Sequence, residues 1–231
     1  MTTLTRTLQN ASRNWMIYTA LLVALAGLVV FSPAEATLGN VVKIVYLHAA
    51  TERIAAYAYL IAGVLGIAYL LLRGASLATK QSPNRSEIAS QKLLAMTNTL
   101  VHWTRAFAET AILFWLAQFI ISAPAQVLAW GAFTLNEPRV ASAMWILAMT
   151  ALVYVVARWM DEPMWMAFAA IANGAIFLIV LQGAVNILHP GSAILGSDSV
   201  TIKFFYAGIV IVCGVIALQL ARDLAARYAR T

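Results

Sequence analysis

Six apolar runs, separated by short polar breaks, dominate the hydrophobic pattern of the chain. A helix needs about 20 consecutive apolar residues to cross the hydrocarbon core of a bilayer. Backbone groups in lipid must be satisfied within the segment, so we expect helices and an all-α fold. The spans are predicted at Trp15–Phe31, from Val45 or Ala49 to Leu72, and at Phe107–Ala123, Val140–Ala157, Met164–Leu188 and Ile202–Ala221.

Proline, glycine and arginine mark the expected ends of these spans. They are Ser32-Pro33, Arg73-Gly74, Pro124, Arg158, Pro163 at the start of the fifth span, Pro190-Gly191, and Arg222. The longest connection, residues 73–104, is predicted to be a cytoplasmic loop whose second half, Ser86–Thr104, could form an amphipathic surface helix. Residues 124–139 are predicted to be an outer aromatic loop. The whole chain, 1–231, is expected to form one membrane domain.

The composition supports this prediction. The chain is 62% hydrophobic and 10% charged, whereas soluble domains are about 45–50% apolar and about 25% charged. The single Cys213 lies in an apolar run, which excludes a disulfide framework and a thiol metal site. Arg6 and Arg13 precede the first run as in a signal peptide, but no clear small-residue cleavage site follows, so we expect a retained first span.

The distribution of Lys and Arg predicts the orientation, because cytoplasmic loops carry an excess of these residues. One side would receive Arg6, Arg13, Arg73, Lys80, Arg85, Lys92, Arg105, Arg158, Arg222, Arg227 and Arg230, and the other only Lys43, Arg53, Arg139 and Lys203. Both termini are therefore expected in the cytoplasm, with the chain in a bacterial cytoplasmic (inner) membrane. The same topology places three unusual stretches on the outer face: the region of His48, residues Trp130–Arg139, and Asn186–Ser192, which contains His189.

The two outer histidines are candidate haem ligands. Haem iron is commonly held by His on one or both axial sides, and His48 and His189 are expected at matched depth on either side of an aromatic loop. The alternative for each is an ordinary polar residue at the membrane interface. A zinc site is less favoured, because it wants three or four ligands and only Glu52, Glu137 and Asp198 are nearby.

Residues near each histidine offer supporting contacts. Gln182, Asn186 and His189 follow i, i+4, i+7 spacing and would share one helix face. Asn186 could hold the second nitrogen of the imidazole, or it could simply make helix–helix hydrogen bonds. Glu52 lies four residues after His48 and could orient it or form a plain interfacial pair, while Arg53 is predicted to face elsewhere.

The aromatic loop could form one wall of a haem site. Trp130 and Phe133 offer flat apolar surface, Gly131 allows close approach, and Arg139 could pair with a propionate. For Trp130 the alternative is the aromatic belt found at membrane interfaces.

At the inner side, His102, Arg105 and Glu109 share a helix face and are read as an interfacial network, with a partner site or second cofactor site as the alternative. The sequence lacks a Gly-rich phosphate loop, a nucleophile–base pair and a catalytic carboxylate pair, so we expect no enzyme activity.

Three of these stretches resemble the cytochrome c maturation protein C family (CcmC, also called heme exporter protein C). Lys43–His48, followed by Ala56–Leu60, is similar to the second span of that family, and Asn186–Ser192 is similar to its "N-x-L-H-x-G-S" outer loop. Residues Trp130–Arg139 lie where the family has its tryptophan-rich signature. Six spans with both termini inside is also the family layout.

The resemblance implies a specific site. His48 and His189 would be axial ligands of a non-covalent b-type haem, and Trp130, Gly131, Phe133, Pro138 and Arg139 are the matching loop positions. The implied partners are an ABC-type transporter pair, a small membrane protein and a periplasmic haem chaperone. The loop departs from the family pattern at four positions: Phe133, Thr134 and Asn136 stand where the family has Trp, and Glu137 stands where it has Asp.

The sequence therefore predicts a haem-handling membrane protein that passes haem to a chaperone for cytochrome c biogenesis. The intact pair of histidines favours this function. The reduced tryptophan loop favours an alternative, a CcmC-like subunit of a larger respiratory or photosynthetic membrane complex. Such a subunit would hold a fixed b-type haem, or none, and would serve structure or electron transfer.

Overall fold

A computed structural model of the chain describes residues 3–80, 87–183, 194 and 196–230. Within these ranges it contains six helices and no strand, which confirms the all-α prediction. The helices are α1 (Thr3–Phe31), α2 (Val42–Lys80), α3 (Glu87–Trp130), α4 (Pro138–Trp159), α5 (Pro163–Gln182) and α6 (Val200–Tyr228). Each is long and apolar enough to cross a bilayer, so the chain is an integral membrane protein.

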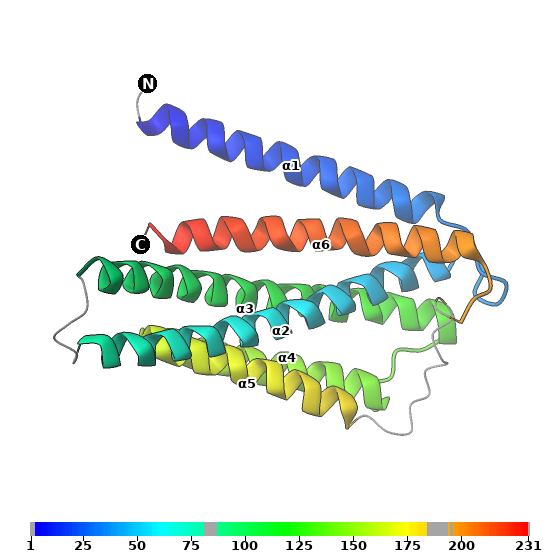
Figure 1. Cartoon of the computed structure of the whole chain (residues 1–231). Coiled ribbons are helices and arrows are strands. Elements are labelled where there is room, and N and C mark those ends of the chain that lie inside the picture. Colours follow the sequence, from blue (N-terminus) through cyan, green and yellow to red (C-terminus); the bar gives the residue numbers. More distant parts are fainter. Residues whose placement is uncertain (1–2, 81–86, 184–193, 195, 231) are drawn as a thin grey trace.

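The helices form an elongated bundle with two distinct ends (Figure 1). Both termini lie at one end, together with the last turn of α2 and the first turn of α3; we call this the termini end. The α1–α2 and α3–α4 loops lie at the opposite end. Helix α2 packs against α3 along most of its length and also against α5 and α6, which makes it the central helix of the bundle. Helix α1 lies outermost and contacts mainly α6.

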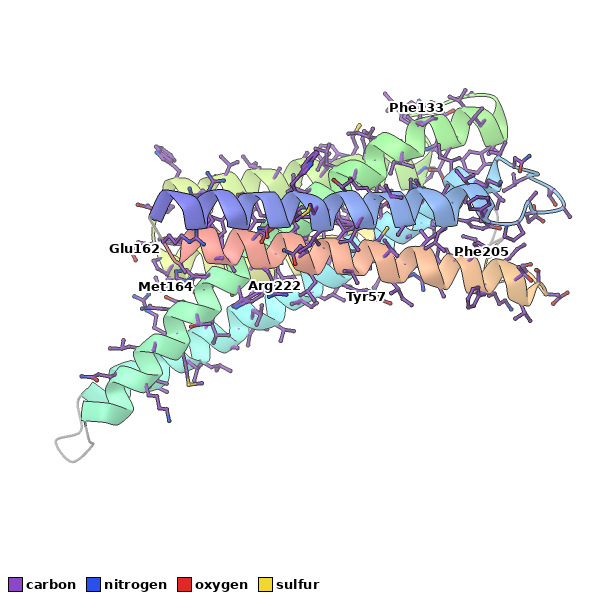
Figure 2. All side chains as sticks on the ribbon, turned by 90° about the horizontal axis from the view of Figure 1, so that it is seen from above. Tyr57, Phe133, Glu162, Met164, Phe205 and Arg222 are labelled. Atoms are coloured by element: carbon purple, nitrogen blue, oxygen red, sulfur yellow. The ribbon has the colours of Figure 1, made fainter. Side chains whose placement is uncertain are left out.

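The α2–α3 hairpin differs from its prediction, because most of the expected loop 73–104 is helical. Arg73-Gly74 does not end α2, which continues to Lys80, and α3 already begins at Glu87. A single glycine costs only about 1 kcal/mol in a helix interior, and the residues that follow it are good helix formers. The two helices therefore run past the rest of the bundle as a projecting hairpin (Figure 2).

Pro124 also fails to end its helix, since α3 passes through it to Trp130. Proline removes one backbone hydrogen bond, which neighbouring groups in a helix bundle can replace. The irregular part of the outer loop is consequently shorter than predicted, with α4 already beginning at Pro138. Helix α5 ends at Gln182 with Gly183 as its C-cap, and the remainder of the predicted fifth span, from 184 to 188, lies outside the described residues.

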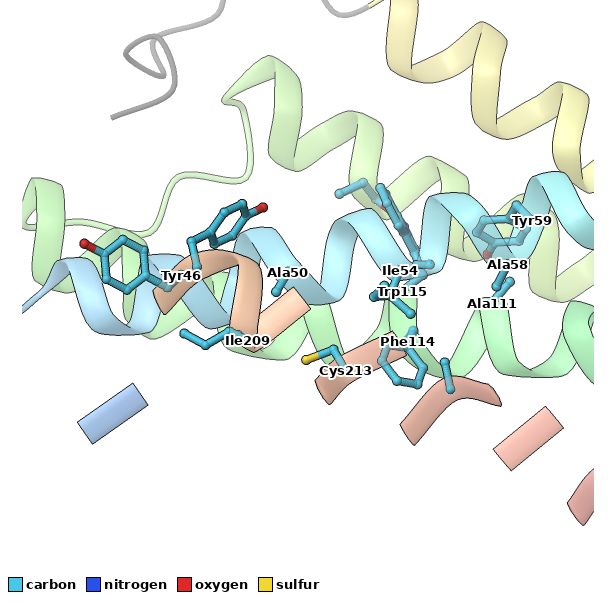
Figure 3. Close-up of a cluster of buried hydrophobic side chains, with 14 of the residues drawn as sticks. Tyr46, Ala50, Ile54, Ala58, Tyr59, Ala111, Phe114, Trp115, Ile209 and Cys213 are labelled. Atoms are coloured by element: carbon cyan, nitrogen blue, oxygen red, sulfur yellow. The ribbon is translucent and has the colours of Figure 1, made fainter. Parts of the chain in front are cut away.

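A buried cluster joins the central helices at mid-bundle. Tyr59 of α2 stacks on Phe177 of α5, with ring centroids 5.5 Å apart, and meets the edge of Trp115 of α3. The Trp115 indole donates a 2.9 Å hydrogen bond to the carbonyl of Ala143 in α4. The Tyr59 hydroxyl lies 2.9 Å from the hydroxyl of Thr150, also in α4. Figure 3 shows how Tyr59 and Trp115 continue into the apolar core toward α6.

Helix α1 is attached to α6 by one carboxylate. Asp223 accepts hydrogen bonds from the Asn14 amide at 3.1 Å and from the Tyr18 hydroxyl at 3.0 Å. Gln219, one turn earlier in α6, donates to the same carboxylate at 3.2 Å. These contacts lie near the middle of α1. They supply directional contacts for a helix that is otherwise largely exposed along its length.

Helix α2 has no room for a side chain against α5 at Gly66. A Cβ atom added there would lie 2.8 Å from the backbone carbonyl oxygen of Ala167. That distance is shorter than van der Waals contact, and a helix backbone cannot move away as a flexible side chain can. Gly66 therefore sets how closely α2 and α5 approach.

We expect Gly66→Ala to force α2 and α5 apart and to destabilise the bundle by about 1–3 kcal/mol, the range typical of overpacking. Thermal unfolding of the purified protein in detergent measures this. Gly74→Ala is the matched control in the same helix, because a Cβ there meets nothing within 4 Å. Equal unfolding temperatures for the two variants would contradict the close-contact role of Gly66.

Candidate functional site

A cavity of about 640 Å³ opens among the helices toward the end opposite the termini. Its size falls within the range of about 300–1,000 Å³ that is usual for small-molecule and cofactor sites. Helices α2 to α6 and the α1–α2 loop all contribute to its walls. Its polar and aromatic lining residues are His48, Glu52, Arg53, Trp115, Gln118, Ser122, Gln126, Trp130, Glu137, Arg139, Phe177 and Tyr206.

The α2 wall consists of a stripe flanked by two polar side chains. Val45, Ala49, Glu52 and Ala56 share one helix face and line the cavity, with His48 and Arg53 roughly 70° to either side of that stripe at 3.6 residues per turn. Arg53 lies on the opposite flank of α2 from His48, yet it lines the same cavity. The cavity is wide enough to reach both flanks of the helix, which spacing along one helix does not reveal.

His48 and Glu52 form the predicted i, i+4 pair. Imidazole Nε2 lies 4.0 Å from carboxylate Oε2, and the two side chains are 15% and 28% exposed. The carboxylate can therefore orient the ring. Within the described ranges, no three His, Cys, Asp or Glu side chains lie close enough together to hold a metal ion. Any metal bound near His48 would thus need donors beyond this set.

The α3 wall carries a polar stripe that the sequence analysis missed. Gln118, Ser122 and Gln126 recur every four residues and all line the cavity. The Gln126 amide donates to the Ser122 hydroxyl at 2.8 Å. The buried Oε1 atom of Gln118 accepts no hydrogen bond from the described part of the chain. The signal was present in the sequence, because polar side chains within an apolar span tend to face protein or a polar cavity.

The α3–α4 loop places some of its predicted residues at the cavity and not others. Trp130 and Arg139 line it, whereas Gly131 and Phe133 do not. Gly131 instead ends α3 with a positive φ of 79°, and its N–H donates to the Val127 carbonyl at 2.9 Å. This conformation suits glycine, so its role is to turn the chain.

Glu137 has two roles at this wall, neither of which was predicted from the sequence. One carboxylate oxygen accepts from the Val140 N–H at 2.8 Å and caps the start of α4. The other oxygen is buried at the cavity, and no hydrogen bond reaches it from the described residues. Glu137 thereby fixes the start of α4, from which Arg139 reaches the cavity.

The third predicted stretch, Asn186–Ser192 with Asn186 and His189, lies wholly outside the described residues. Gln182 is exposed and is absent from the cavity wall. Leu181 and the buried Ile194, which stand on either side of this stretch, both line the cavity. Leu181 and Ile194 are thus the nearest described residues on either side of His189 in the sequence that line the cavity.

The α1–α2 loop covers part of the cavity through Leu38. The Glu35 carboxylate accepts hydrogen bonds from the backbone N–H groups of Thr37 and Leu38, each at 2.8 Å. These donors, that of Leu38 first, hold the pKa of the Glu35 carboxyl below its usual range. The turn that they stabilise sets Leu38 against the cavity.

A second, smaller cavity of about 200 Å³ lies toward the termini end and includes His102, Arg105 and Tyr228 in its lining. Glu109 belongs to a side-chain network there, but the hydrogen bonds to it come from tyrosines of other helices, which were not predicted. Glu109 accepts hydrogen bonds from the hydroxyls of Tyr154 in α4 and Tyr228 in α6. The Arg105 guanidinium lies 3.6 Å from the centroid of the Tyr228 ring. The cluster therefore ties α3, α4 and α6 together.

Comparison of the chain with protein-family models, with curated proteins and with solved structures finds no match. The function must accordingly be argued from the residues and the geometry of the cavity.

Proposed function

We propose that the chain binds a non-covalent b-type haem in the large cavity and hands it on during cytochrome c biogenesis. One observation carries the proposal: His48, Trp130 and Arg139, from three different helices or loops, line a single cavity. A histidine nitrogen, a flat apolar surface and a cation are the groups that a haem requires for its iron, ring and propionates.

The other walls of the cavity fit such a ligand. Its inner end is formed by the Trp115 and Phe177 rings, which meet edge to face with centroids 5.4 Å apart. The small side chains of Ala49 and Ala56 leave room for a flat ring system to approach α2 closely. The Trp115 and Phe177 rings give this end of the cavity an apolar lining. His189 would be the second histidine to hold the haem iron, and Leu181 and Ile194, which line the cavity on either side of it in the sequence, support this.

Each described residue has a defined task in this proposal. His48 supplies an imidazole nitrogen to the iron, and Glu52 orients the ring, as carboxylates near metal-binding histidines do. Trp130 covers the ring at the outer end, and Arg139 pairs with a propionate. The haem supplies the redox-active iron; the protein binds, orients and shields it. On this proposal the chain is a binding and transfer component without enzyme activity of its own.

The proposed setting follows from the charge distribution. Both termini would lie in the cytoplasm and the cavity would open at the outer face of the bacterial cytoplasmic membrane. The proposed partners are an ABC-type transporter pair and a periplasmic haem chaperone. The position of both termini at the end opposite the cavity supports such an arrangement.

A second candidate function is a fixed haem subunit, or a structural subunit, in a larger respiratory or photosynthetic complex. It is favoured by the loop, where Trp130 lines the cavity but Gly131 and Phe133 do not. A reduced aromatic platform offers less surface for presenting haem to a chaperone. Release of bound haem to an apo-chaperone would support the first function, and retention would support the second.

We expect His48→Ala to weaken haem binding by at least about 10–100-fold, since even changes next to a metal ligand cost that much. The measurement is an optical spectrum of the purified protein, oxidised and reduced, with a haem titration. His189→Ala should behave in the same way. His102→Ala is the control, because this histidine lines the smaller cavity at the other end. A wild-type protein that cannot be loaded, or His48→Ala and His189→Ala spectra that match the wild type, would refute the proposal.

We expect Glu52→Gln to weaken haem binding by about tenfold, the lower end of the range for groups that orient a metal-bound histidine. The effect should be modest because the carboxylate is 4.0 Å from the imidazole, beyond hydrogen-bond distance. The same titration measures it, and the iron should keep its ligands in the spectrum. Unchanged affinity would show that the pair is merely interfacial.

A further inference from the structure

We propose that Arg53 is an anion-binding residue of the cavity and that it holds a carboxylate of the bound ligand. The inference rests on the proposed haem function, because it assigns a propionate to this residue. Arg53 stands within the second membrane span, where an arginine is costly and commonly marks a functional site.

The surroundings of Arg53 leave its charge available to a ligand. Within the part of the chain that the structure describes, no carboxylate oxygen lies within 4.0 Å of the guanidinium; the neighbouring Glu52 pairs with His48 instead. The guanidinium lies over the ring of Tyr206 in α6, 5.7 Å from its centroid. This contact fixes the side chain against α6 at the cavity without neutralising it.

The position of Arg53 relative to His48 suits a flat ligand with an anionic edge. The two residues flank the cavity-facing stripe of α2 on opposite sides, and Arg53 lies five residues further along, about 7–8 Å at the helical rise. A ring system whose iron His48 holds would therefore cross the stripe between Ala49 and Glu52 to reach Arg53. Arginine suits this role because its planar fork matches a carboxylate in two hydrogen bonds.

Arg53 differs from Arg139 in what it can recognise. Arg139 is exposed at the start of α4, where any anion can reach it. Arg53 is partly buried between α2 and α6, beside Glu52 and Tyr206, so only an anion that enters the cavity can reach it. Arg53 is thus a specificity-determining residue that favours a carboxylate-bearing porphyrin over a neutral one.

The test compares haem with its dimethyl ester, which has the same ring and iron but no free carboxylates. Both are titrated into the full-length purified protein in detergent, and absorbance gives each Kd. We expect Arg53→Gln to bind haem about 10- to 100-fold more weakly, as for loss of a hydrogen bond to a charged group, and to bind the diester as the wild type does. Arg53→Lys should recover part of the loss.

Lys203→Gln is the matched control, since it removes one positive charge from an exposed residue at the start of α6 that does not line the cavity. It should leave both affinities unchanged. If Arg53→Gln weakens haem and diester equally, or weakens neither, the assignment of Arg53 is overturned while haem binding stands. If the wild type binds neither compound, the proposed function is itself overturned, and the assignment of Arg53 with it.

Discussion

The indole of Trp115 is the point on which the rest of this structure depends. Its N–H satisfies the Ala143 carbonyl of α4, its ring meets Tyr59 of α2 and Phe177 of α5, and it is almost completely buried. In a membrane the hydrophobic effect does not drive helices together, so packing and interhelical hydrogen bonds must do so. One side chain of α3 thereby fixes three neighbouring helices. Because Trp115 and Phe177 also form the inner end of the cavity, the shape of the site depends on the same contacts as the fold.

Each helix contributes a different kind of side chain to the walls of the cavity. Helix α2 brings ionisable groups, α3 brings neutral amides and a hydroxyl, and the start of α4 brings Glu137 and Arg139. Polar groups at such depth are tolerated where they face protein or a polar cavity. The polar stripe of α3 and the buried oxygen of Glu137 supply hydrogen-bonding groups beyond what an apolar ring needs. They suit bound water or the polar edge of a ligand.

Much of the fold could be predicted from the sequence, because the length and hydropathy of each span report directly on the bilayer. The C-terminal ends of α2 and α3 could not, since Gly74 and Pro124 are helix-stop signals in water that a helix bundle tolerates. At the site, His48, Trp130 and Arg139 could be identified because they lie at or near the ends of predicted spans. That Arg53 lines the cavity could not be predicted, because the spacing along one helix does not show how far a cavity extends around it. Gln118, Ser122 and Gln126 form a polar repeat in the sequence, but the repeat alone does not show which helices lie opposite it.

The projecting α2–α3 hairpin limits how another molecule can approach the termini end of the bundle. Helices of 39 and 44 residues are about 58 and 66 Å long at 1.5 Å per residue, whereas a bilayer with its headgroups is about 40–45 Å thick. The excess projects from the bundle as a stalk, continuous with the two helices that carry His48 and the polar stripe. A tilt of that stalk would act as a lever on both long walls of the cavity at once.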